Sequence, residues 1–70
     1  MLPLAMANPG ERCTVKRIGG KEEVRRFLET LGFVVGSEVT VVSENNGNVI
    51  VNVKGSRIAI SHEMANKIMI

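Results

Sequence analysis

The stretch ETLGFVVGSEVTVV, Glu29 to Val42, decides the fold, because it takes the chain from the end of a helix straight into a strand. Gly32 stands where a left-handed helix cap belongs, a conformation that glycine adopts without steric cost. Beyond it, Glu38 to Ser43 shows the period-two alternation of a β-strand. The stretch therefore predicts a helix that is locked tightly onto a β-sheet.

The helix lies upstream, where four apolar residues recur at i, i+3, i+4 and i+7 and so share one stripe: Val24, Phe27, Leu28 and Leu31. This spacing predicts a helix from Lys21 to Leu31, with Phe33 packing back against it. We expect the stripe to close one end of the core. Replacing Phe27 or Leu28 with alanine should then cost about 2–5 kcal/mol.

The rest of the chain reads as short strands separated by turns. Asn46-Gly47 favours a type I′ hairpin, Lys54-Gly55 forms a second tight turn, and Ser61 can cap a short helical turn near Ser61 to Ala65. The predicted strands are Arg12 to Ile18, Glu38 to Ser43, Asn48 to Val53, Ser56 to Ile60 and a short apolar close at 67–70. The fold class is thus mainly β, a small five-stranded barrel with one inserted helix.

The composition is that of one ordinary soluble domain over residues 1–70, with 44% hydrophobic and 23% charged residues. A single cysteine excludes an internal disulfide and fits a reducing cytosol. The apolar opening, Leu2 to Ala7, lacks the charged start and the length of a signal peptide, and no run approaches the roughly 20 apolar residues of a membrane span. We expect a cytoplasmic protein that is not itself inserted in a membrane.

Catalytic chemistry has few candidates, because the chain holds one histidine, His62, and one cysteine, Cys13. Cys13 alternates inward with Val15, where a thiol behaves as a small hydrophobe. Phosphate-loop, dinucleotide and zinc-helix motifs are all missing. We expect no catalytic residue, no cofactor and no enzymatic activity. His62 with Glu63 is the most that the sequence offers a metal, whereas a specific site takes three or four ligands, so no metal site is expected either.

Nucleic acid is an unfavourable partner. The basic residues Lys16, Arg17, Lys21, Arg25 and Arg26 are interleaved with Glu22, Glu23 and Glu29. Glu22 and Arg26 form an i, i+4 pair, typical of a solvated helix face. Both aromatic residues are assigned to the core, so none is free to stack on bases. The remaining class is a small module that docks on another protein.

Four segments carry a resemblance to a known family: ANPGERCTVKRIGG (7–20), VRRFLETLGFVVGSEVTVV (24–42), VIVNVKGSRIAI (49–60) and EMANKIMI (63–70). In order and spacing the chain resembles the FeoA family, small cytosolic accessory proteins of bacterial ferrous iron transport. The most specific part runs from Arg26 through Leu31-Gly32-Phe33 to Gly36 and Val41. Val35, where the family often has proline, and Ser61-His62, where basic residues are common, depart from the pattern.

The resemblance implies an SH3-like barrel that docks on the cytosolic GTP-binding region of the membrane transporter FeoB and modulates uptake. Exposed polar residues on the helix, Arg25, Arg26 and Glu29, are the docking candidates. It also implies a cytoplasmic protein, peripheral to the inner face of the membrane through its partner, and we expect a monomer or a weak homodimer. The alternative is a nucleic-acid-binding or metal-responsive regulatory module, since the same SH3-like unit occurs fused to metal-dependent repressors.

Overall fold

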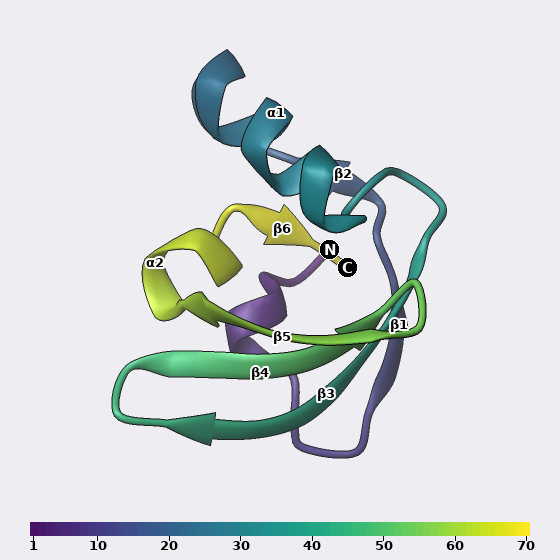
Figure 1. Cartoon of the computed structure of the whole chain (residues 1–70), viewed down its shortest axis with the longest axis vertical. Coiled ribbons are helices and arrows are strands. Elements are labelled where there is room, and N and C mark those ends of the chain that lie inside the picture. Colours follow the sequence, from purple (N-terminus) through teal and green to yellow (C-terminus); the bar gives the residue numbers. More distant parts are fainter.

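The computed structural model describes residues 1–70 and is mainly β, with one substantial helix (Figure 1). Its elements in chain order are η1 (Leu4–Met6), β1 (Arg12–Thr14), β2 (Arg17–Ile18), α1 (Glu22–Leu31), β3 (Glu38–Asn45), β4 (Asn48–Val53), β5 (Ser56–Ser61), α2 (His62–Ala65) and β6 (Ile68–Met69). The predicted inserted helix and the short helical turn near Ser61 to Ala65 are confirmed.

The strands form two antiparallel sheets, one in the order β1-β3-β4-β5 and one of β2 with β6. Both hairpin turns of the β3-β4-β5 meander have positive φ at their central residues, Asn46-Gly47 and Lys54-Gly55, as a type I′ turn requires. The predicted meander is therefore confirmed. β3 also carries an irregularity between Val41 and Ser43, which bends the strand.

The predicted first strand, Arg12 to Ile18, is wrong in one respect, because it divides into β1 and β2. Val15 donates its N–H to the carbonyl of Ser37 (2.9 Å), while the next residue, Lys16, donates to Met69 (2.8 Å). The chain thus leaves the larger sheet and enters the smaller one between these residues. Six strands result instead of five, and the sheets do not close into one continuous barrel.

Gly32 ends α1 as the sequence predicted. Its φ of 108° is a conformation that L side chains rarely adopt, and its N–H donates to the carbonyls of Leu28 and Glu29. The following residue, Phe33, donates its N–H to Leu28 (3.0 Å) and is fully buried. The cap therefore reverses the chain and drives an aromatic ring into the core within two residues.

Replacing Gly32 with alanine should lower the free energy of unfolding by about 1–3 kcal/mol, because a residue with a Cβ is strained at positive φ. That Cβ would also lie 2.8 Å from Cγ of Lys54, whose side chain must move. Gly36→Ala is the matched control, since Gly36 has φ 94° and nothing within 4 Å. Urea unfolding should rank Gly32→Ala as the costlier change, and an unchanged midpoint for Gly32→Ala would contradict the assigned cap.

The core is one cluster of 13 buried residues contributed by both helices, both sheets and the N-terminal segment. The members are Leu4, Ala5, Val15, Leu28, Phe33, Val39, Val41, Val49, Val51, Val53, Ile60, Ala65 and Ile68. Cys13 is also buried, as predicted. Phe27 corrects the prediction, because it is 48% exposed. On α1 it lies one residue off the buried Leu28, at the edge of the stripe, so replacing Phe27 with alanine should cost less than the stripe predicted.

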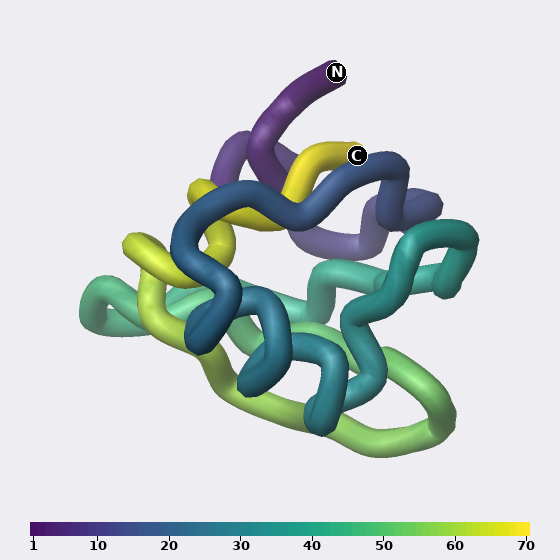
Figure 2. The backbone as a smooth tube through the Cα atoms, turned by 90° about the horizontal axis from the view of Figure 1, so that it is seen from above, coloured from purple at the N-terminus to yellow at the C-terminus, as the bar shows by residue number.

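The two ends of α1 lie beside different parts of the chain. Gly20, just before the helix, lies against the side chain of Lys67, and Gly32, just after it, lies against Lys54 at the β4–β5 turn. In Figure 1 the helix lies above the larger sheet and both chain termini lie between the two, and Figure 2 shows the termini at the side of the molecule away from β5. One flank of α1 faces β2 and the segment that leads into β3.

Candidate docking site

The two candidates for nucleophilic chemistry lie at opposite ends of β3. Cys13 pairs with Val39 near the start of that strand, whereas His62 lies near Glu44 close to its end. Burial, with a smaller contribution from the carboxylate of Glu11, raises the pKa of the Cys13 thiol. The protonated thiol is a weak nucleophile and a weak metal ligand, and His62 is too remote to activate it.

The acidic residue that forms an ion-pair contact with His62 is Glu44, on β3. Nε2 of His62 lies 3.9 Å from Oε2 of Glu44, and both side chains are about half exposed. Its backbone N–H donates to Gly47, which places α2 beside the β3–β4 turn. Nowhere do three His, Cys, Asp or Glu side chains gather closely enough to hold a metal ion.

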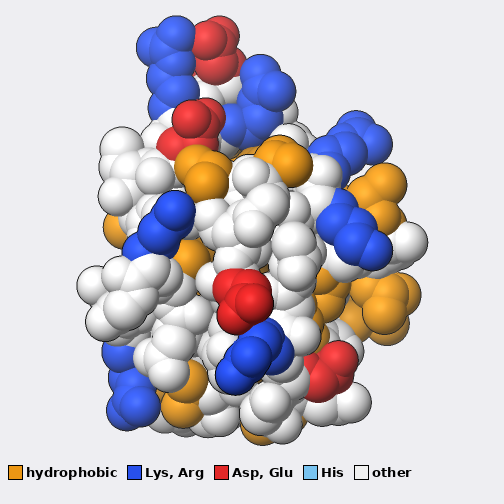
Figure 3. All heavy atoms as spheres, turned by 90° about the vertical axis from the view of Figure 1, so that its right-hand side faces the viewer, with side chains coloured by type: hydrophobic (Ala, Val, Ile, Leu, Met, Phe, Trp, Pro, Cys, Tyr) orange, Lys and Arg blue, Asp and Glu red, His pale blue; other side chains and the backbone are white.

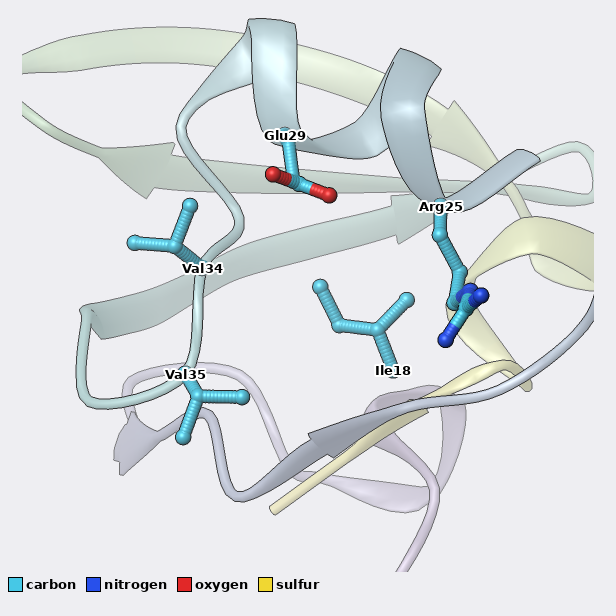
Figure 4. A pocket seen from close by; sticks show the side chains of 5 residues that line it. All are labelled: Ile18, Arg25, Glu29, Val34 and Val35. Atoms are coloured by element: carbon cyan, nitrogen blue, oxygen red, sulfur yellow. The ribbon is translucent and has the colours of Figure 1, made fainter. Parts of the chain in front are cut away.

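A concave site lies instead along α1. A hollow of about 250 Å³ is lined by Ile18, Arg25, Glu29, Val34 and Val35 (Figure 4). Arg25 and Glu29 extend into it from one flank of the helix, Ile18 from β2, and the two valines from the segment that links α1 to β3. Val35 is 69% exposed, which is unusual for a large apolar side chain and leaves one apolar wall open to a partner.

Backbone hydrogen bonds hold the valine wall in place. Gly36 donates its N–H to Val15 (2.8 Å), and Val15 donates in return to Ser37 (2.9 Å). Val34 to Ser37 form a turn, which is closed by a hydrogen bond from the N–H of Ser37 to the carbonyl of Val34 (2.9 Å). Since both sides of the hollow are tied to the sheets and to the capped helix, its shape is largely formed before a partner arrives.

The charged groups of the hollow are available for new contacts. Arg25 and Glu29 follow one another at i, i+4, yet neither takes part in the three ion pairs of the chain. Arg26 differs, because its guanidinium lies 2.7 Å from the carboxylate of Glu22 and does not line the hollow. The structure thus brings two of the three predicted docking residues together and separates the third.

Three lining residues were not predicted, namely Ile18, Val34 and Val35. Val35 carried a partial signal, because it is an apolar residue next to Gly36 in a segment with no strand or helix period. Ile18 and Val34 carried none, since their approach to α1 depends on how the chain turns between the two sheets.

A hollow with an apolar wall and a cation and an anion at its rim suits an apolar side chain flanked by polar groups.

The charge distribution gives no broad basic surface on the face seen in Figure 3. Lys and Arg side chains alternate there with acidic and hydrophobic ones, and both signs occur together over the end of α1. A nucleic-acid site usually carries clustered Lys and Arg instead. None of the helices has the length and apolar composition needed to span a membrane.

Comparison with known proteins gives a consistent result. A family model described as the FeoA domain matches residues 2–70. A protein of Methanocaldococcus jannaschii, provisionally named Fe(2+) transport protein A, is 41% identical over 70 residues, which is the whole of this chain and 85% of that protein.

Solved structures share the fold, among them the following two. The crystal structure of an iron uptake regulatory protein (FeoA) superposes with a TM-score of 0.89 at 32% identity, covering 97% of this chain and 90% of that one. FeoA of Stenotrophomonas maltophilia, solved with zinc and described as a procaryotic SH3 domain protein, gives a TM-score of 0.85 at 23% identity, covering 99% and 88%. The second likeness supports the SH3-like fold alone.

Proposed function

Because this chain belongs to the FeoA family, and is thus an accessory protein of ferrous iron transport, we propose that it docks through the hollow beside α1 on the cytosolic GTP-binding region of the transporter FeoB. Docking there modulates ferrous iron uptake. The protein acts in the cytoplasm and reaches the inner face of the membrane through this partner. The chemistry of transport belongs to the transporter, and this chain supplies binding.

The observation that carries the proposal is the hollow itself. Arg25 and Glu29 present charges that no ion pair of the chain uses, and Val35 presents an exposed apolar wall on the segment that links α1 to β3. Protein interfaces concentrate their binding energy in a few such places, where an apolar or arginine anchor meets a pocket. A partner that inserts an apolar side chain would cover Val35 and meet both charges at the rim.

The contact should be modest in size and transient. A standard interface buries about 800 Å² per partner, which is about a fifth of the 4357 Å² surface of this chain. A hollow lined by five residues anchors only part of such an area. Weak association suits an accessory protein that adjusts its partner and then leaves it.

Two substitutions in the hollow should weaken docking while the fold is kept. Arg25→Ala removes the rim cation, and Val35→Asp puts a charge where an apolar side chain must be covered. Each should raise the Kd for the purified cytosolic domain of FeoB about tenfold, the effect of losing roughly 1.4 kcal/mol. Isothermal titration calorimetry with GTP present measures this directly.

Arg26→Ala is the matched control, since it removes the same charge from the same helix outside the hollow. Its Kd should stay within about twofold of the unmodified protein, because exposed ion pairs contribute little. Equal losses for Arg25→Ala and Arg26→Ala would show that charge alone, and not the hollow, governs binding. No loss in either hollow variant would place the docking surface elsewhere.

A further inference from the structure

The larger sheet ends at β5, whose only strand neighbour is β4. His62 donates its N–H to Gly47, and along the register Val49 faces Ile60 and Val51 faces Ile58. In an antiparallel ladder every second pair of residues is hydrogen-bonded. Because His62 bonds to Gly47, the pairs Ile60–Val49 and Ile58–Val51 are the hydrogen-bonded ones, and the backbone groups of Ile58 and Ile60 point towards β4. The N–H and carbonyl groups of Arg57 and Ala59 therefore point away from the sheet.

This edge lacks the usual protection. Edge strands are commonly guarded by a charged side chain, a proline or a covering element. The one charged side chain of β5 is that of Arg57, and its Nε contacts Oδ1 of Asn52 (3.5 Å), which draws the guanidinium back over β4. α1 crosses above β5 in Figure 1 but buries Leu28 in the core, and Arg57 and Ala59 are both exposed.

We propose that β5 pairs with β5 of a second copy of this chain, antiparallel and centred on Ile58. In this register Arg57 of each copy faces Ala59 of the other, and the outward N–H and carbonyl groups of both residues bond across the two-fold axis. Arg57 of each chain therefore lies opposite the methyl group of Ala59, and the two arginines do not face each other. Ile58, half-buried on the core side, faces Ile58 of the second copy in an apolar cross-strand pair.

The edge thus matches itself in hydrogen bonding and in apolar contact, and the register places no two like charges directly opposite each other. A net charge of +2 per copy opposes association only weakly. The inference does not rest on docking to the transporter, because the hollow is built from α1, β2 and the link to β3 and shares no residue with β5. The two proposals can therefore fail separately.

Cysteine cross-linking tests the register. Directly opposite residues of a non-hydrogen-bonded pair have Cα atoms about 4.5 Å apart, within the range of a disulfide. In a Cys13→Ser background, Ile58→Cys should give a covalent dimer under mild oxidation. Ser56→Cys should not, because residue 56 of one copy faces residue 60 of the other. Equal cross-linking of both variants, or of neither, would overturn the register.

Sedimentation equilibrium of the whole chain tests the association itself. Ala59→Pro removes an outward donor while the ladder to β4 stays intact, and it should weaken dimerisation about tenfold or more. Ala59→Ser keeps the donor and should match the unmodified protein. Circular dichroism confirms that each variant is folded. A chain that stays monomeric at millimolar concentration, or an Ala59→Pro variant that dimerises as well as Ala59→Ser, would refute the proposal.

Discussion

Phe33→Ala is expected to lower the free energy of unfolding by about 3–5 kcal/mol, which would leave most molecules unfolded at room temperature. Phe33 is the largest fully buried side chain, with no solvent exposure. A domain below about 80 residues rarely has more than 3–5 kcal/mol of stability from its core. The loss of this one ring should therefore remove nearly all of the free energy of unfolding.

Phe27→Ala is the matched control, because it removes the same ring from a site that is 48% exposed. We expect it to cost about 1 kcal/mol, since half of the ring is in water in the folded state. Urea unfolding followed by circular dichroism compares the two variants. Similar losses would contradict the structure, because they would require Phe27 to be buried as the apolar stripe alone predicts.

Leu4→Ala is expected to cost about 2–5 kcal/mol, although Leu4 lies near the start of the chain. Its side chain has no solvent exposure, and η1 lies against α2 and β6. The segment is held by reciprocal hydrogen bonds between Leu2 and Ile70, at 3.0 and 2.7 Å. Losing Leu4 should open a cavity under both chain termini.

Met6→Ala controls for this change, because Met6 belongs to the same short helix and is 66% exposed. It should shift the midpoint of urea unfolding only slightly. If Leu4→Ala shifted the midpoint of urea unfolding as little as Met6→Ala, the N-terminal segment would not be packed in the core, which would contradict the structure.

Most of the fold could be predicted from local patterns. The stripe of α1, the cap at Gly32 and the turn at Asn46-Gly47 each depend on a few neighbouring residues whose backbone preferences agree. The division of β1 from β2 could not be predicted, because it depends on Val15 and Lys16 bonding to different sheets. The burial of Leu4 is equally non-local, since the partners of its segment lie at the other end of the chain.

The candidate site was predictable only on the helix. Exposed charges on α1 pointed to Arg25, Arg26 and Glu29, but a sequence cannot tell which flank of a helix adjoins a hollow. That choice depends on β2 and on the bond from Gly36 to Val15, which bring Ile18 and Val35 beside Arg25 and Glu29. Phe27 illustrates the same limit, because helical period places it at the edge of the stripe without fixing its exposure.

One titration tests the central claim most directly. The ¹⁵N-labelled protein is titrated with the cytosolic domain of FeoB, with and without GTP, and in parallel with mixed DNA and RNA. We expect the amide resonances of Ile18, Arg25, Glu29 and Val35 to shift with the transporter domain, and no resonance to shift with nucleic acid. Salt-sensitive shifts with nucleic acid, and none with the transporter domain, would contradict docking and favour a regulatory module.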